Sequence, residues 1–149
     1  MYTSLDLIPQ QVYTRQELRE KFNIIDKTMD TGVFKPRGTR SIGLFVTEEK
    51  GQDQSQYKDR LDGDTLQWQG QMSGRTDKLI FTHQDEGNEV IVFYRKNKAE
   101  HPGAGFRYLG RFHYQSHYAS HPTSFVLVAE EDSTLIWQAL NTKPKHGRQ

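Results

Sequence analysis

Three neighbouring segments in the middle of the chain hold side chains that suit contacts with nucleic acid. They are residues 57–60 (YKDR), 68–71 (WQGQ) and 74–77 (GRTD). Glutamine amides can form paired hydrogen bonds with base edges, and arginine binds phosphate or guanine. Aromatic rings can stack on an exposed base, and glycines allow close backbone approach. The clustering of these residue types predicts a nucleic-acid-binding site.

Each of these features has a plainer explanation when it is taken alone. A single tryptophan such as Trp68 is more often part of the core than a platform for a base. A glutamine on the outer face of a strand usually contacts solvent, and Asp77 can orient Arg75. Residues 35–40 (KPRGTR) add a turn with three cations upstream. The hypothesis therefore depends on these segments meeting in the folded chain.

Motifs for catalysis are absent from the sequence. It has no phosphate-binding P-loop, no G-x-S-x-G elbow, no H-E-x-x-H helix and no dinucleotide fingerprint. His113, His117 and His121 are spaced four apart, but this stretch is predicted to be a strand, where such residues lie too far apart to share a zinc ion. We expect no catalytic residue, no metal and no cofactor.

Acidic residues near a turn leave one alternative open. Asp59, Asp62 and Asp64 could hold Mg²⁺ in a degenerate nuclease. Asp62 and Asp64 flank Gly63, however, and that pattern is ordinary turn chemistry. We expect these carboxylates to be structural.

Composition limits the class of protein. The 149 residues suit one domain. The mean hydropathy is low at −0.86, but seven Tyr, eight Phe and two Trp supply a small core. The absence of cysteine excludes disulfides and thiolate zinc sites. Twenty basic residues oppose nineteen acidic ones, so any basic face must be local. No apolar run reaches membrane-spanning length, and we expect a cytoplasmic protein.

The elements that position the candidate residues are mostly strands. Thr14 and Glu17 form a capping box that predicts a helix to about Phe22, and a second short helix could start at Asp26. Six strands are predicted, and the third and fourth are joined as a hairpin through residues 85–88. The strands are residues 41–47, 65–71, 79–83, 90–94, 106–114 and 123–129.

This order of elements predicts an α+β, mainly β fold, a small partly closed β-barrel with one or two flanking helices. Residues 1–130 are expected to form the recognition domain. Residues 131–149 are expected to form a C-terminal helix, over 131–140, and a basic linker or tail.

Several segments, in one order, resemble a bacterial domain family formerly of unknown function. They are residues 44–47 (LFVT), 57–61 (Y-x-D-x-L), 68–71 (WQ-x-Q) and 106–110 (FRYLG). The family occurs at the C-terminus of proteins that fuse a phospholipase-D-like nuclease to a superfamily 2 helicase, and beside HNH nucleases in type IV restriction. The resemblance covers roughly residues 13 to 128. Gly70 stands where the family pattern has a serine.

The resemblance implies recognition of modified double-stranded DNA, with cytosine methylation as the expected modification, for a nuclease or helicase in the same or a partner chain. It implies a barrel like the SRA and PUA groups, which would flip a base, or a B3-like barrel, which would read the major groove. Tyr57 and Trp68 would be pocket aromatics, and Gln69, Gln71 and Asp77 would bond base edges. The full set of candidate DNA-binding residues is Lys35, Arg37, Arg40, Tyr57, Arg60, Trp68, Gln69, Gln71, Arg75, Thr76 and Asp77.

A second function class is also compatible with the sequence. The domain could be a protein-interaction module that couples a helicase or nuclease to its partner. An exposed aromatic patch with few cations around it would favour that class.

Overall fold

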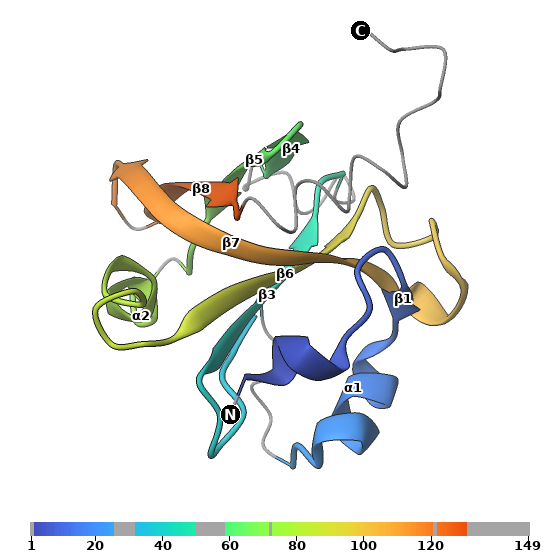
Figure 1. The fold of residues 1–149 in the computed structure, drawn as a ribbon. Helices are drawn as coiled ribbons and strands as arrows, with labels where there is room; N and C mark the ends of the chain where they lie inside the picture. The colour runs from blue at the N-terminus through green and yellow to red at the C-terminus, as the bar shows by residue number, and fades with distance from the viewer. Residues whose placement is uncertain (1, 26–31, 50–58, 72, 121, 131–149) are drawn as a thin grey trace, which may run out of the picture.

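The computed structural model describes residues 2–25, 32–49, 59–71, 73–120 and 122–130. Within these residues eight strands form one mixed sheet (Figure 1). The strands are β1 (Val12–Tyr13), β2 (Val33–Phe34), β3 (Ser41–Thr47), β4 (Arg60–Asp62), β5 (Thr65–Gln69), β6 (Glu89–Arg95), β7 (Phe106–Tyr118) and β8 (Ser124–Ala129). The helices are α1 (Arg15–Phe22) and α2 (Asp77–Phe81), with short 3-10 turns η1 (Thr3–Asp6) and η4 (Pro102–Ala104).

The sheet is open. Its order is β2-β3-β6-β7-β8-β5-β4, so β2 and β4 are the two ends, and β1 pairs separately with β7. The mainly β class is confirmed, but the partly closed barrel is not, because the end strands do not pair with each other. The β3–β6 pair is parallel, and the other pairs are antiparallel.

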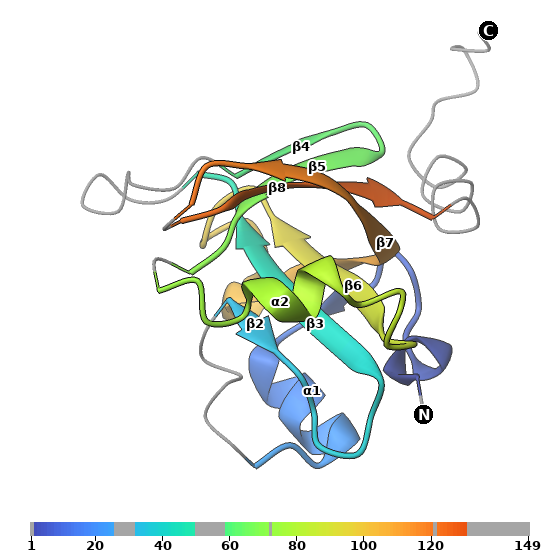
Figure 2. The ribbon, with the colours of Figure 1, turned by 90° about the vertical axis from the view of Figure 1, so that its left-hand side faces the viewer.

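The long strand β7 belongs to both halves of the sheet and connects them. Its first half, up to Phe112, pairs with β6, and the half that begins there pairs with β8. A register irregularity between Tyr114 and Ser116 marks the second half. Such irregularities bend a strand and increase its twist. The sheet consequently curves, with β8, β5 and β4 on one side of α2 and β3 and β6 on the other (Figure 2).

Strands β3 and β6 are buried on both faces. Ile42 and Leu44 point into one hydrophobic cluster, and Phe45 points into a second cluster on the opposite face. A strand that is covered on both faces typically has a continuous apolar sequence, as residues 41–47 (SIGLFVT) do. Helix α2 covers the first face through the fully buried Ile80, and α1 covers the second through Leu18.

The capping box that was predicted from Thr14 and Glu17 is confirmed. The Thr14 hydroxyl accepts from the Glu17 N–H at 3.0 Å, and the Glu17 carboxylate accepts from the Thr14 N–H at 2.8 Å. The helix ends at Asn23, whose φ of 55° is left-handed. The predicted helix at Asp26 and the whole of residues 131–149 lie outside the described residues.

The hairpin predicted between residues 79–83 and 90–94 is wrong. Residues 77–81 form helix α2 instead of a strand. A short apolar run such as Leu79-Ile80-Phe81 has no periodicity that separates a helix from a strand. The five other predicted strands are confirmed. Residues 41–47 have the predicted bounds, and the other four have shifted ends; for example, β5 stops at Gln69 and β7 continues to Tyr118. Strands β1, β2 and β4, which are two or three residues long, were not predicted.

Candidate nucleic-acid interface

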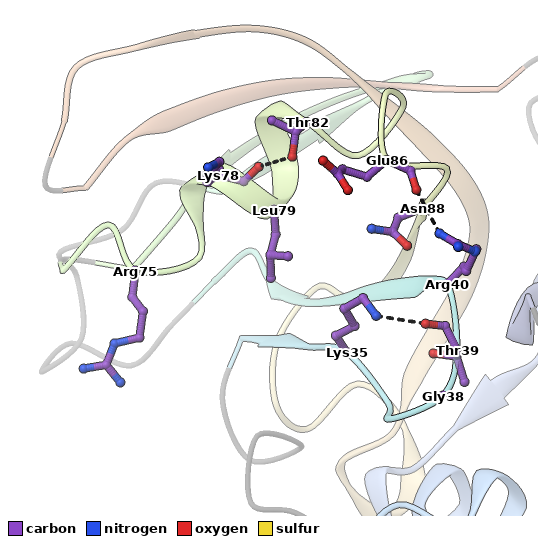
Figure 3. A pocket seen from close by; sticks show the side chains of 10 residues that line it. All are labelled: Lys35, Gly38, Thr39, Arg40, Arg75, Lys78, Leu79, Thr82, Glu86 and Asn88. Carbon is purple, nitrogen blue, oxygen red and sulfur yellow. Dashed lines mark hydrogen bonds between the residues drawn. The ribbon is translucent and has the colours of Figure 1, made fainter.

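A cavity of about 650 Å³ lies between α2, the turn that joins β2 to β3, and the segment that leads into β6 (Figure 3). Four cations and one carboxylate face it, so its lining is strongly positive. We call it the basic pocket. Its lining residues are Lys35, Gly38, Thr39, Arg40, Arg75, Lys78, Leu79, Thr82, Glu86 and Asn88.

Lys35 and Arg40 stand at the two sides of the β2–β3 turn. Gly38, with φ +79°, permits the turn to close. The Lys35 ammonium donates to the Thr39 carbonyl at 2.9 Å, and the Arg40 guanidinium donates to the Glu86 carbonyl at 2.9 Å (Figure 3). These carbonyl partners orient the two cations without neutralising their charge.

Arg75 and Lys78 enter the pocket from the other side. Both side chains are exposed, and Figure 3 shows Arg75 at the rim, away from the other cations. In the part of the chain that the structure describes, none of the pocket cations forms an ion pair. The pocket therefore offers unneutralised positive charge on two opposite walls, which suits an anionic ligand such as phosphate.

Arg37 extends the positive surface beyond the pocket. It lines a neighbouring cavity of about 340 Å³ with Lys21 of α1, and that cavity shares Gly38 and Thr39 with the basic pocket. Three of the cations that the sequence singled out, Lys35, Arg40 and Arg75, thus meet in one cavity, and Arg37 lies beside it.

Arg60 and Gln69 are placed elsewhere. Arg60 pairs in register with Gln67, and alternation along β5 puts Gln67 and Gln69 on the face opposite Leu66 and Trp68. Because α2 packs on the Leu66 and Trp68 face, these polar residues point away from α2. Neither Gln69 nor Gln71 lines the basic pocket.

The interpretation of Trp68 as a pocket aromatic is wrong for this structure. Its side chain is 4% exposed and packs on Phe125 with ring centroids 5.6 Å apart. A base could reach it only if the core opened. Tyr57, the other aromatic of that prediction, lies outside the described residues.

Thr76 and Asp77 sit at the start of α2. Asp77 Oδ2 accepts from the Thr123 hydroxyl at 2.5 Å, so this carboxylate ties α2 to the start of β8. Gly70 makes room for it, since a Cβ at Gly70 would lie 3.0 Å from Asp77 Oδ1 and 3.0 Å from a ring carbon of Phe125. The serine that the family pattern places at this position would meet the same neighbours.

Sequence reasoning missed Lys78, Leu79 and Thr82 because residues 79–83 were interpreted as a strand. A helix predicted over this segment would have placed these residues beside Arg75. Positions 75, 78, 79 and 82 follow the i, i+3, i+4, i+7 spacing typical of one helical face, and all four line the basic pocket, although only Lys78 and Leu79 lie within α2 and Arg75 and Thr82 flank it.

The described acidic and histidine candidates are not gathered into one group of metal-binding side chains. Among the described residues no group of three His, Cys, Asp or Glu side chains could hold a metal ion. Asp59 is 6% exposed and accepts from the Gln69 N–H, whereas Asp62 and Asp64 are exposed. His121 lies outside the residues that the structure describes.

Fold and pocket together define a small, mainly β module with a cationic cavity at its short helix. The chain belongs to the family described as Domain of unknown function (DUF3427), whose model matches residues 7–138. No curated protein sequence matches it. Within the described chain, no helix is both long enough and apolar enough to cross a membrane.

A solved structure of a modification dependent TagI restriction endonuclease shares the fold. The TM-score is 0.50 at 18% sequence identity, and the match covers 84% of this chain. The chain spans 50% of that protein's length, so the likeness concerns one part of the endonuclease.

Proposed function

We propose that this domain is a DNA-recognition module of a restriction or defence system, and that the basic pocket binds backbone phosphates. The observation that carries the proposal is the meeting of Lys35, Arg40, Arg75 and Lys78 around one cavity without ion pairs between them and carboxylates of the described residues. Phosphate contacts supply most of the affinity of such proteins for DNA. The fold shared with a modification dependent restriction endonuclease supports this assignment.

The orientation of the pocket cations also supports binding to a fixed anion. Backbone carbonyls hold Lys35 and Arg40 in place, so less side-chain entropy is lost when a phosphate binds. Arg75 and Lys78 are exposed and adaptable. Two cations oriented by carbonyls and two exposed cations suit a DNA strand whose phosphates must be both positioned and bound.

We further propose that the module discriminates modified from unmodified DNA and takes a nuclease or helicase, in the same or a partner chain, as its effector. Cytosine methylation is the modification to test first. Among the described residues that line the basic pocket there is no aromatic ring, so the pocket itself favours contacts with the backbone over stacking on a base. An apolar contact with one methyl group is worth on the order of 1 kcal/mol, so we expect modest discrimination.

Binding to a labelled duplex at several salt concentrations tests the role of the pocket. Each of Arg75→Ala and Lys78→Ala should weaken binding and reduce the slope of log affinity against log salt by about 0.9, the value for one lost phosphate contact. Arg60→Ala is the matched control, because this exposed arginine points away from α2. Equal losses for all three variants would contradict a specific role for the pocket.

Matched duplexes with and without 5-methylcytosine test the second part. We expect tighter binding to the methylated duplex, by up to roughly tenfold. Equal binding to both, with the pocket variants still impaired, would leave a DNA-binding domain without selectivity for this modification. If the domain binds no DNA, a protein-interaction module becomes the better explanation of its function.

A further inference from the structure

A cluster of aromatic side chains lies beside α2, the helix that also lines the basic pocket. Phe81, at the end of α2, packs against two residues of β7. Its ring centroid is 4.5 Å from that of His117 and 5.5 Å from that of Tyr114. We call these three residues the aromatic cluster. The aromatic cluster does not line the basic pocket, and it is not simply part of the core, since His117 is exposed and Phe81 is 36% exposed.

The aromatic cluster is rigid where it meets solvent. The Tyr114 hydroxyl and His117 Nδ1 lie 2.6 Å apart, within hydrogen-bonding distance. Phe81 is anchored from behind by Phe125, with ring centroids 5.3 Å apart. The His117 ring is therefore held by a hydrogen bond and by ring packing, although it lies on the surface. A planar surface that is already ordered loses little entropy when another ring stacks on it.

Helix α2 connects the aromatic cluster to the basic pocket. Lys78 lines the pocket and Phe81 belongs to the cluster, and side chains three residues apart on a helix are neighbours. The basic pocket and the aromatic cluster are thus connected through neighbouring positions of one helix. Positive charge beside an exposed aromatic surface is the combination that binds single-stranded or unstacked nucleotides.

We propose that the aromatic cluster stacks an unpaired base of DNA whose phosphates are held by the basic pocket. The inference rests on the proposed function, and it names the DNA that this surface prefers, namely DNA with an unpaired nucleotide. His117 presents its ring to the base, Phe81 supports that ring from below, and Tyr114 fixes its orientation. The base stacks on an exposed surface and does not enter the core near Trp68.

The register of β7 supplies a matched control. His117 pairs with Phe125, on the α2 side of the sheet, whereas Tyr118 pairs with Ser124 and points to the opposite side. Tyr118 is 57% exposed, so its replacement should not disturb the core. A neighbouring aromatic residue of the same strand therefore tests whether exposed rings in general, or this side of the strand in particular, contact the base.

The test compares a fully paired duplex with the same duplex carrying one bulged 2-aminopurine, at one salt concentration. The wild-type domain should bind the bulged duplex roughly 5- to 100-fold more tightly, as expected for one stacked base, and should quench the 2-aminopurine fluorescence. His117→Ala should remove both the preference and the quenching while leaving affinity for the paired duplex unchanged. His117→Phe should retain the preference, and Tyr118→Ala should behave as wild type.

The outcomes separate the two proposals. If the domain binds paired duplex through Arg75 and Lys78 but shows no preference for the bulge, the aromatic cluster is not a base platform and the proposed function stands. If Tyr118→Ala loses the preference and His117→Ala keeps it, the base stacks on the other side of the sheet and the inference is wrong. If no DNA binds at all, both proposals fail. Melting temperatures equal to that of the wild type would exclude unfolding as the cause of a variant's lost binding or lost preference.

Discussion

His83 is a buried histidine that uses both ring nitrogens inside the fold. Its side chain is 2% exposed. Nδ1 lies 2.9 Å from the Asn88 carbonyl, and Nε2 accepts the Tyr114 N–H at 3.0 Å. The first bond requires a proton on Nδ1 and the second requires a bare Nε2, so the ring is neutral. Since Asn88 lines the basic pocket, the histidine supports a pocket wall.

Burial lowers the pKa of His83 below its ordinary 6.5. As pH falls through 6.5, the unfolded chain takes up a proton that the folded chain does not, so the free energy of unfolding decreases. We predict a stability that is constant above about pH 7.5 and declines towards pH 5. Urea unfolding at a series of pH values measures it.

His83→Gln is the control for this pH dependence. The amide oxygen of glutamine can accept the Tyr114 N–H, and the side chain does not titrate in this range. The variant should be less stable near neutral pH, with a smaller decline towards pH 5. A variant whose decline equals that of the wild type would show that other groups, such as carboxylates, dominate the acid sensitivity.

Individual site residues were predictable only in part. Lys35, Arg40 and Arg75, which line the basic pocket, were among the candidates because a cationic turn and a glycine-rich turn are visible in the sequence. Their convergence depends on contacts between distant segments, which no local pattern encodes. Trp68 was misassigned because a side chain that can stack on a base can equally fill a core.

At the scale of elements, Gly43 shows how closely β2 packs on β3. A Cβ at Gly43 would lie 2.2 Å from Cε1 of the Phe34 ring. That ring is 4% exposed and stacked on Phe45 with centroids 4.9 Å apart, so it cannot move aside easily. The glycine is needed for close approach of a neighbouring aromatic ring.

We predict that Gly43→Ala destabilises the domain by roughly 1–3 kcal/mol, the usual range for an overpacked core. Gly32→Ala is the matched control, because a Cβ there would meet nothing closer than the Phe45 carbonyl oxygen at 4.0 Å. It should be neutral or slightly stabilising, since alanine restricts the unfolded chain. Chemical denaturation of both variants checks the difference, and equal stabilities would mean that the Phe34 ring relocates at little cost.

The elements differ in how far the sequence predicts them. Helix α1 carries its own start signal in Thr14 and Glu17, and β3 is a long apolar run, so both are visible locally. Strands of two or three residues, such as β1 and β2, show no periodicity. The parallel β3–β6 pairing joins segments far apart in sequence, and the partly closed barrel is not confirmed because β2 and β4 are the ends of the sheet in the described residues.

At the scale of the whole molecule, the proposal separates DNA recognition from DNA cleavage. We predict that this chain binds DNA without cutting it in the presence of Mg²⁺, because the exposed Asp62 and Asp64 belong to a tight turn. Incubation of plasmid DNA with the purified chain and Mg²⁺, followed by gel electrophoresis, tests this. Cleavage that disappears in an Asp62→Ala, Asp64→Ala double variant, with DNA binding kept, would instead establish a nuclease.

The pairing of β1 with β7 determines when the N-terminal part of the chain can fold during synthesis. Gln10 accepts a hydrogen bond from Arg107, 97 residues later, and β1 pairs with the first residues of β7. At ribosomal speeds of about 5–20 residues per second, this partner emerges roughly 5 to 20 s after Gln10. Until then the segment around β1 exposes Leu7 and Tyr13, which are buried in the folded domain, and chaperones have that interval in which to bind it.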